Sequence, residues 1–154
     1  MATMTEEFSW TGKSVLVAGG AGFIGSHLVE LLVAADARVT VLDTLASGRR
    51  DNLVSVSDSI TLTQQDIRRV AWTQYLSTHP ADVIFHLAAN AYVPPSVACP
   101  SFDFETNCVA TFRLLEALRT MQWPGRLVFA SSAAVYGNAV RVPVAVGDEP
   151  GEAP

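Results

Sequence analysis

The chain has 154 residues, of which 49% are hydrophobic and 16% are charged, and its formal net charge is −5. These values are typical of a single globular domain with an acidic surface, which argues against nucleic acid as a partner. No apolar run approaches the 18 or so residues that a membrane helix needs, so no membrane association is expected.

Apolar runs of strand length alternate along the chain with stretches of helical period, which is typical of βαβ units and a parallel sheet. Runs such as VLVA and VIF do not alternate with polar residues, which suits strands that are buried on both faces. The expected strands cover residues 13–18, 38–42, 60–64, 82–86 and 126–130.

Three stretches between these strands predict helices. In 23–35 the apolar residues Phe23, Ile24, Leu28, Leu31 and Leu32 recur at steps of three and four, which predicts that this face lies on the sheet. A shorter helix is expected over 67–77, ended by Pro80 at the latest. The third helix, 101–121, repeats the period with Phe104, Cys108, Phe112, Leu115 and Leu118.

The segment VLVAGGAGFIGSHL joins the first strand to the first helix and spaces Gly19, Gly22 and Gly25 as G-x-x-G-x-x-G. A strand, a tight glycine turn and a helix N-terminus together favour a phosphate site, because unpaired amides and the helix dipole attract anions. Glycines also serve ordinary βα turns, so the motif by itself leaves both interpretations open.

The second strand ends at Asp43, 18 residues after Gly25, where an acidic residue can accept hydrogen bonds from an adenosine ribose. A carboxylate there repels the extra phosphate of NADP and favours NAD, although Arg49 and Arg50 lie close by in the sequence. The alternative is that Asp43 is a turn residue that caps the loop 43–52.

Six segments in order, which together span about residues 13–138, resemble the extended short-chain dehydrogenase/reductases, in particular the NAD-dependent nucleotide-sugar epimerase/dehydratase family. The segments are GGAGFIGSHL (19–28), LDTLASG (42–48), QDI (65–67), FHLAA (85–89), ETNCVAT (105–111) and SSAAVYG (131–137). The resemblance implies an α/β fold of the Rossmann type, a doubly wound parallel sheet with strand order 3-2-1-4-5. It divides the chain into an N-terminal extension (1–12), the NAD-binding domain (13–138) and a loop (139–154).

The resemblance also implies which residues contact the cofactor. Phe23 and Ile24 would lie against the pyrophosphate, and Asp66 and Ile67 would hold the adenine, its amino group on the carboxylate and its ring against the apolar side chain. The full set of expected cofactor residues is Gly19, Gly22, Phe23, Ile24, Gly25, Asp43, Ser47, Gly48, Asp66, Ile67, Leu87, Ala88, Ala89 and Thr106. His86 belongs to the same motif but is expected to be a core histidine whose ring is satisfied.

In SSAAVYG, Ser132 matches the Ser/Thr that hydrogen-bonds the sugar hydroxyl undergoing oxidation, which makes it the one expected catalytic residue. Similar dehydratases carry an Asp and a Glu at the next two positions, where this chain has Ala133 and Ala134. Without a carboxyl group there is no acid or base to expel water, so dehydration is disfavoured. A UDP-glucose 4-epimerase-like activity is the nearest resemblance, and Tyr136 is expected to be structural.

The Tyr-x-x-x-Lys pair that the family uses as its catalytic base is absent from the sequence. Its three tyrosines are followed four places later by His79, Ser96 and Val140, and the only lysine is Lys13. We therefore expect the N-terminal part of a longer enzyme that acts on a nucleotide sugar, either as a fragment or as a degenerate gene product. The alternatives are a catalytically silent NAD-binding module, or a reductase or dehydratase of the same superfamily.

Three further expectations concern the chain's surroundings. The helix 101–121 would normally pack against a later helix, so its apolar surface predicts self-association, for instance as a homodimer. Glu6 and Glu7 stand where a secretory signal carries basic residues, so a cytoplasmic location is expected. Cys99 and Cys108 match no metal or redox spacing, so we expect no metal and two reduced thiols with a structural role.

Overall fold

A computed structural model describes residues 8–137 of the chain. Its centre is a sheet of five strands in the order β3-β2-β1-β4-β5, and all four neighbouring pairs are parallel. The predicted strand order is therefore confirmed. The predicted loop 139–154 and residues 1–7 of the predicted extension lie outside the described residues.

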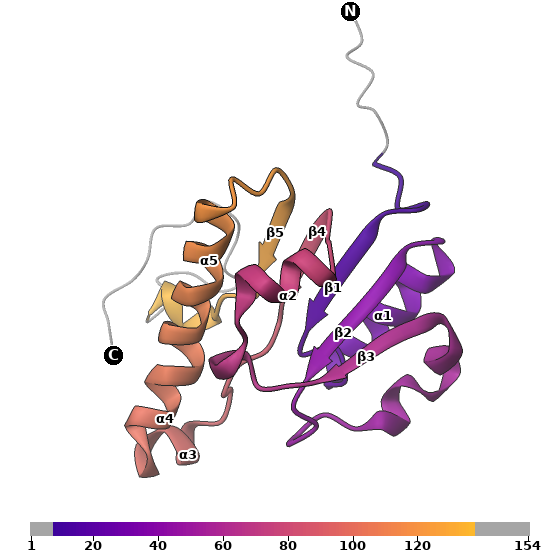
Figure 1. Cartoon of the computed structure of the whole chain (residues 1–154). Coiled ribbons are helices and arrows are strands. Elements are labelled where there is room, and N and C mark those ends of the chain that lie inside the picture. Colours follow the sequence, from indigo (N-terminus) through magenta and orange to yellow (C-terminus); the bar gives the residue numbers. More distant parts are fainter. Residues whose placement is uncertain (1–7, 138–154) are drawn as a thin grey trace, which may run out of the picture.

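The five strands begin and end within one residue of the predicted ranges. They are β1 (Ser14–Ala18), β2 (Arg38–Asp43), β3 (Ile60–Gln64), β4 (Val83–His86) and β5 (Arg126–Phe129). Because all the strands run the same way, their carboxyl ends meet at one edge of the sheet, the lower edge in Figure 1.

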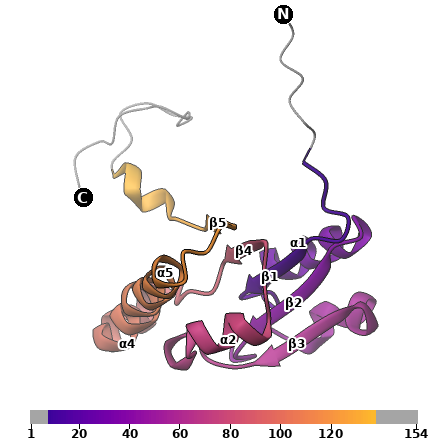
Figure 2. The ribbon, with the colours of Figure 1, turned by 45° about the horizontal axis from the view of Figure 1, so that its top comes forward.

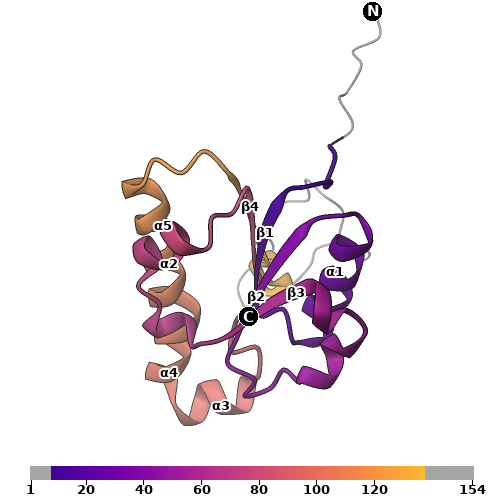
Figure 3. The ribbon, with the colours of Figure 1, turned by 45° about the vertical axis from the view of Figure 1, so that its right-hand side comes forward.

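Helices cover both faces of the sheet (Figure 3). One layer holds α1 (Phe23–Ala34) and a 3-10 helix (Arg50–Ser59); the other holds α2 (Trp72–Thr78) and α5 (Ala110–Thr120). Alternate residues of β1 enter the two cores, Val15 and Val17 below α1 and Leu16 and Ala18 below α5, and all four are at most 1% exposed. The unbroken apolar run of this strand thus follows from burial on both faces.

The helix predicted over 101–121 is present but has three parts. α4 (Pro100–Phe104) leads into a π-helical turn (Glu105–Val109) and then into α5, and Figure 2 shows the three in one line. We call this combined helix, 100–120, the long helix. A short helix, α3 (Val93–Ala98), precedes it and was not predicted, and neither were the 3-10 helix Arg50–Ser59 and the 3-10 turn Ala133–Tyr136.

The predicted helix 67–77 is interrupted. A 3-10 turn (Ile67–Arg69) comes first, and α2 begins only at Trp72. Val70 between them has φ −69° and ψ 126°, an extended conformation that places its side chain in the core, where it is 7% exposed. Tertiary burial of Val70 therefore outweighs the helical period of the sequence.

The predicted buried face of α1 is partly wrong. Leu32 is buried and Leu28 packs against the core, as predicted, but the other three residues lie on the solvent side. The core side of α1 is formed by Gly25, Ser26, Val29 and Leu32, whereas Phe23, Ile24 and Leu31 are 80%, 71% and 69% exposed. In the first turn the small residues Gly25 and Ser26 take the core side, because this turn packs closely on the glycine turn that precedes it. No helix within residues 8–137 is long and apolar enough to span a membrane.

The position of Gly25 in the first turn of α1 gives a test of this packing. A Cβ atom at Gly25 would overlap the carbonyl oxygen of Gly19 and approach the Cα of Gly20 to 2.7 Å. Gly25→Ala should lower the free energy of unfolding by about 2–3 kcal/mol, because neither contact is with a flexible side chain. The helix propensity gained is about 1 kcal/mol and does not offset this loss. Denaturant unfolding measures the difference.

Gly22→Ala is the matched control, because a Cβ there meets only the Gly19 carbonyl oxygen, at 3.3 Å. This variant should stay within about 1 kcal/mol of the wild type. Equal losses in both variants would contradict the packing described here.

Candidate functional site

The glycine turn leaves the carboxyl end of β1 and passes close to the segment that follows β4. Gly19 has φ +85°, and its N–H donates to the carbonyl oxygen of Leu42 (2.8 Å). A Cβ atom on Gly19 would lie 2.7 Å from the backbone nitrogen of Ala88. Only glycine fits here, because both the conformation and the space exclude a side chain.

The glycine turn places the N-terminus of α1 at the edge of the sheet where the carboxyl ends of the strands lie. Gly22 is the N-cap residue of α1. Among the residues that the structure describes, no side chain caps this end, and the first turn carries no acidic residue. The first amides of the helix are therefore free to bind an anion, which the helix dipole also favours. Phe23 and Ile24 lie on this first turn, with exposed side chains.

Asp43 holds the glycine turn against the end of β2. It is 8% exposed, and its two carboxylate oxygens accept hydrogen bonds from the Ala21 N–H (3.0 Å) and the Leu45 N–H (2.8 Å). The capping role considered for Asp43 is thus present. Each carboxylate oxygen keeps a further lone pair, so the cap leaves acceptor capacity for a ligand.

A cleft of about 450 Å3 opens at this edge of the sheet. Its size is in the range of small-molecule sites. Of the predicted cofactor residues, those that line it are Gly19, Gly22, Asp43, Ser47, Gly48, Asp66, Ile67, Leu87, Ala88, Ala89 and Thr106. Gly25 is buried against the turn, and Phe23, Ile24 and Ser132 lie outside the cleft lining.

Eight further residues line the cleft and were not predicted. They are Leu42, Thr44, Ala46, Gln65, Arg68, Asn90, Tyr92 and Phe102. Leu42, Thr44, Ala46 and Gln65 lie inside the quoted segments, and Arg68 and Asn90 directly follow one. The rule that ligands bind outside the carboxyl ends of parallel strands could have indicated these six. Phe102 comes from the long helix, and no sequence pattern places it here.

Asp66 is the N-cap of the 3-10 turn after β3 and is paired with Arg68. The Asp66 Oδ1 accepts from the Arg68 backbone N–H (2.9 Å), and Oδ2 accepts from Nη2 (2.6 Å) and Nε (3.0 Å) of the same arginine. The hydrogen bonds from Arg68 lower the pKa of Asp66 below its ordinary value. The carboxyl group is therefore ionised at neutral pH.

The π-helical turn of the long helix supplies Thr106 and Asn107 to the site. Thr106 is 9% exposed, and its hydroxyl donates to the Phe102 carbonyl oxygen (2.7 Å). The Asn107 side chain accepts from the Asn90 N–H (2.8 Å) and donates to the Asn90 carbonyl oxygen (3.0 Å). This pair of bonds fixes the segment after β4 to the helix, which keeps that wall of the cleft in place.

His86, at the end of β4, is buried (2% exposed). The Thr111 hydroxyl donates to the Asn107 carbonyl oxygen (2.8 Å), so it accepts from the His86 Nε2–H (3.0 Å). This network places the proton on Nε2 and leaves Nδ1 without a hydrogen bond from the described residues. The expected core position is confirmed, but the expectation of a fully satisfied ring is wrong.

Ser132 follows β5 at the same edge of the sheet and is exposed. Its carbonyl oxygen accepts from the Val135 N–H (3.1 Å) at the start of the 3-10 turn Ala133–Tyr136. Cys99 and Cys108 are free and exposed, so the expected structural role through burial is wrong. Within residues 8–137 no group of three or more His, Cys, Asp or Glu side chains could hold a metal ion.

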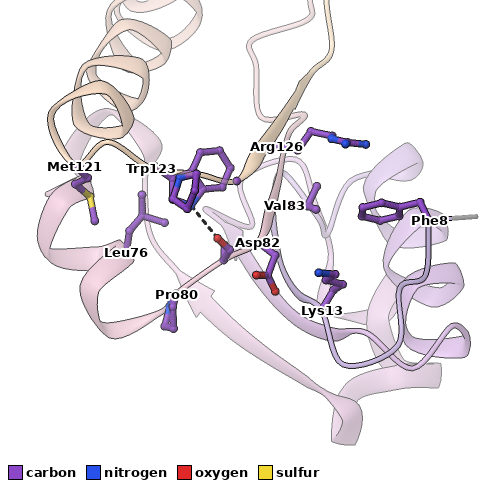
Figure 4. A pocket seen from close by; sticks show the side chains of 12 residues that line it. Phe8, Lys13, Leu76, Pro80, Asp82, Val83, Met121, Trp123 and Arg126 are labelled. Atoms are coloured by element: carbon purple, nitrogen blue, oxygen red, sulfur yellow. Dashed lines mark hydrogen bonds between the residues drawn. The ribbon is translucent and has the colours of Figure 1, made fainter. Parts of the chain in front are cut away.

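A second cavity, of about 470 Å3, lies at the opposite edge of the sheet, where the strands begin (Figure 4). Two of its polar side chains bind the backbone: the Asp82 carboxylate accepts from the Ser14 N–H (2.8 Å), and the Trp123 indole N–H donates to the Ala81 carbonyl oxygen (2.8 Å). The only lysine, Lys13, lines this cavity. A five-residue strand spans about 17 Å, so Lys13 is far from the cleft.

Comparisons with known proteins agree with this geometry. Residues 16–150 match the family model of GDP-mannose 4,6-dehydratase. The UDP-glucose 4-epimerase of Mycolicibacterium smegmatis is 42% identical over 130 residues, which are 83% of this chain and 42% of that protein. A dTDP-glucose 4,6-dehydratase of Mycobacterium tuberculosis is 39% identical over 127 residues, covering 80% of this chain and 38% of that protein.

Solved structures of epimerases have the same fold. The UDP-N-acetylglucosamine 4-epimerase of Methanobrevibacter ruminantium superimposes with a TM-score of 0.79 at 36% identity, covering 90% of this chain and 44% of that one. The UDP-glucose 4-epimerase of Brucella ovis, solved in complex with NAD, has a TM-score of 0.79 at 32% identity. The match covers 91% of this chain and 42% of that one. The chain thus spans well under half the length of the proteins that it matches.

The burial of His86 predicts a pH dependence of stability. Burial lowers the pKa of His86 below its ordinary value of 6.5, so the folded protein keeps the ring neutral while the unfolded chain takes up a proton as the pH falls below 6.5. The free energy of unfolding should therefore decrease from pH 7 to pH 5, by at most about 1.4 kcal/mol per pH unit from this group. Denaturant unfolding at several pH values measures the slope.

His86→Gln removes the titrating group while its amide can still donate to Thr111, so the slope between pH 5 and 7 should become shallower. An unaltered slope in His86→Gln would exclude His86 as its source.

Proposed function

Since the chain belongs to the NAD-dependent epimerase/dehydratase family, whose GDP-mannose 4,6-dehydratase model matches residues 16–150, we propose that it is the dinucleotide-binding part of a UDP-glucose 4-epimerase-like enzyme. The proposed cofactor is NAD. The observation that carries the proposal is the cleft at the carboxyl edge of the sheet, where the uncapped N-terminus of α1 adjoins the glycine turn and Asp43. The Brucella ovis epimerase structure, which contains NAD, supports the same cofactor.

The residues of the cleft fit a dinucleotide. Gly19 and Gly22 bring the backbone of the turn to the cleft, and the first amides of α1 can bind the oxygens of a pyrophosphate. Asp43 can accept from the hydroxyls of the adenosine ribose, since its two backbone bonds leave lone pairs free. Asp66 and Ile67, at the end of β3, stand where the adenine is proposed to bind.

In the complete enzyme NAD would supply a hydride acceptor and donor for reversible oxidation at the sugar C4. Ser132 would hydrogen-bond the reacting hydroxyl of the nucleotide sugar from its place after β5. Ala133 and Ala134 provide no acid or base at the two positions that the resembling dehydratases use, so elimination of water is disfavoured. The proposed reaction is therefore an isomerisation, the inversion of one hydroxyl-bearing carbon without net redox change.

A catalytically silent NAD-binding module is the second candidate. The observation in its favour is that the sequence has no Tyr-x-x-x-Lys pair, and that its only lysine lies at the far edge of the sheet. A dehydratase or reductase of the same family is a third candidate, supported by the 39% identity to a dTDP-glucose 4,6-dehydratase. The cytoplasmic location expected from the sequence stays a prediction.

Self-association through the long helix is part of the proposal. Its sheet-facing side is formed by Ala110, Leu114, Ala117 and Leu118. A second apolar row on the same helix is solvent-exposed, with Phe104 59%, Phe112 63% and Leu115 46% exposed. A second copy of the chain that presents the same row would remove these side chains from water, as in a symmetric dimer.

The first test is the affinity for NAD and NADP, measured by titration calorimetry. The chain should bind NAD at least about tenfold more tightly than NADP, because the Asp43 carboxylate repels a 2′-phosphate. Asp43→Asn should reduce this preference, whereas Asp36→Asn, at an exposed position, should not. With UDP-glucose and NAD together, these 154 residues should form no UDP-galactose.

Equal affinity for the two dinucleotides would contradict the role of Asp43. Turnover by the chain alone would show that the absent Tyr-x-x-x-Lys pair is not required, and would exclude the silent module.

The second test is sedimentation velocity at increasing protein concentration. The wild type should sediment as a dimer or larger species at high concentration, and Phe112→Ser should shift it toward the monomer by lowering the apolar area available for burial. Val54→Ser is the control, since Val54 is 72% exposed on the opposite layer. A wild type that stays monomeric throughout the concentration range would count against this interface.

A further inference from the structure

Arg68 connects two walls of the cleft. It belongs to the 3-10 turn after β3, and its guanidinium group lies over the ring of Phe102 in α4, 4.4 Å from the ring centroid. Its Nη1 is 3.7 Å from a carboxylate oxygen of Glu105. Its backbone carbonyl oxygen accepts from Nη1 of Arg113 (2.8 Å). The arginine is thus held from the side of the long helix as well as from its own turn.

The same guanidinium group fixes the carboxylate of Asp66. Nε and Nη2 both donate to Oδ2, and Nε also lies 3.1 Å from Oδ1. A planar fork that engages a carboxylate from one side determines the orientation of that carboxylate, which a single-point cation does not. Both side chains are 23% exposed and both residues line the cleft, so a ligand in the cleft can reach the pair.

A carboxylate in a fixed orientation discriminates between bases. An ionised Asp66 accepts hydrogen bonds and donates none, so it pairs with an amino group and repels a carbonyl oxygen. Hypoxanthine carries an oxygen where adenine carries the amino group, and its ring nitrogen N1 carries a hydrogen that adenine N1 lacks. A carboxylate fixed toward the amino group therefore meets an oxygen in hypoxanthine, whereas a carboxylate that can turn is able to accept from N1–H instead. A carboxylate that rotates freely would adapt less selectively to the base.

We propose that Arg68 is a positioning residue that orients the Asp66 carboxylate toward the exocyclic amino group of the adenine ring and thereby sets the base specificity of the cleft. The proposal rests on the dinucleotide-binding function proposed above. Arg68 acts through Asp66, and it does so because its position is fixed from the long helix by Phe102 and Glu105.

The experiment compares the affinities for NAD and nicotinamide hypoxanthine dinucleotide by calorimetry. The wild type should bind NAD at least about tenfold more tightly, because one hydrogen bond to a charged group changes an affinity by about this factor. In Arg68→Met the preference should fall to about threefold or less. Arg68→Lys keeps the charge without the planar fork and should give an intermediate value.

Arg69→Met is the matched control for charge. Arg69 is the adjacent residue and is exposed, and its positive charge acts on Asp66 without a hydrogen bond between the two side chains. This variant should keep the wild-type preference. The ratio of the two affinities is the informative quantity, because a general loss of structure would weaken both dinucleotides alike and leave the ratio unchanged.

Each other outcome has a definite meaning. An unchanged ratio in Arg68→Met, or an equal loss for both dinucleotides, overturns this inference and leaves the proposed function standing. A wild type that binds both dinucleotides equally overturns the role of Asp66 and of Arg68 together. A wild type that binds neither dinucleotide overturns the proposed function and this inference with it.

Discussion

The contact between the backbones of the glycine turn and its neighbours is the constraint on which the rest of the structure depends. Gly19 leaves no space for a Cβ beside Ala88, and Gly25 leaves none beside Gly19. The first contact brings the segment after β4 against the end of β1, and the second brings the start of α1 onto the turn. Asp43 then joins the end of β2 to the turn through the Ala21 N–H. Three strand ends and one helix N-terminus are thereby placed around a single cleft.

The same constraint explains why the first turn of α1 presents small residues to the sheet and large ones to the solvent. Close approach of its first turn requires Gly25 and Ser26 on the inner side, which leaves Phe23 and Ile24 outside. The sequence does contain an apolar period, but the period does not determine which side of the helix packs against the sheet. On the long helix the row that contains Leu114 and Leu118 is buried against the sheet, whereas the row that contains Phe112 is exposed.

The π-helical turn of the long helix links the fold to the site. It places Thr106 at the cleft and Asn107 against Asn90, so the helix on one layer fixes the segment that follows β4. Arg68 adds a second link between the helix and the cleft, through Phe102 and Glu105. Both links are side-chain contacts between segments far apart in the sequence. The walls of the cleft belong to different elements, and these contacts fix the walls relative to one another.

The sequence by itself determined the five strands, the position of the glycine turn and most residues of the cleft, because the parallel strands and the motifs at their ends have local patterns. It also determined the family, because each of the six motifs is a short run of consecutive residues and the motifs follow one another in the expected order. Only the tertiary structure decided which face of each helix is buried, where Val70 interrupts a helix, and that Phe102 and Arg68 meet Asp66 at one wall. These features depend on what lies opposite each side chain, and that follows from how the layers pack rather than from the order of residues along one segment.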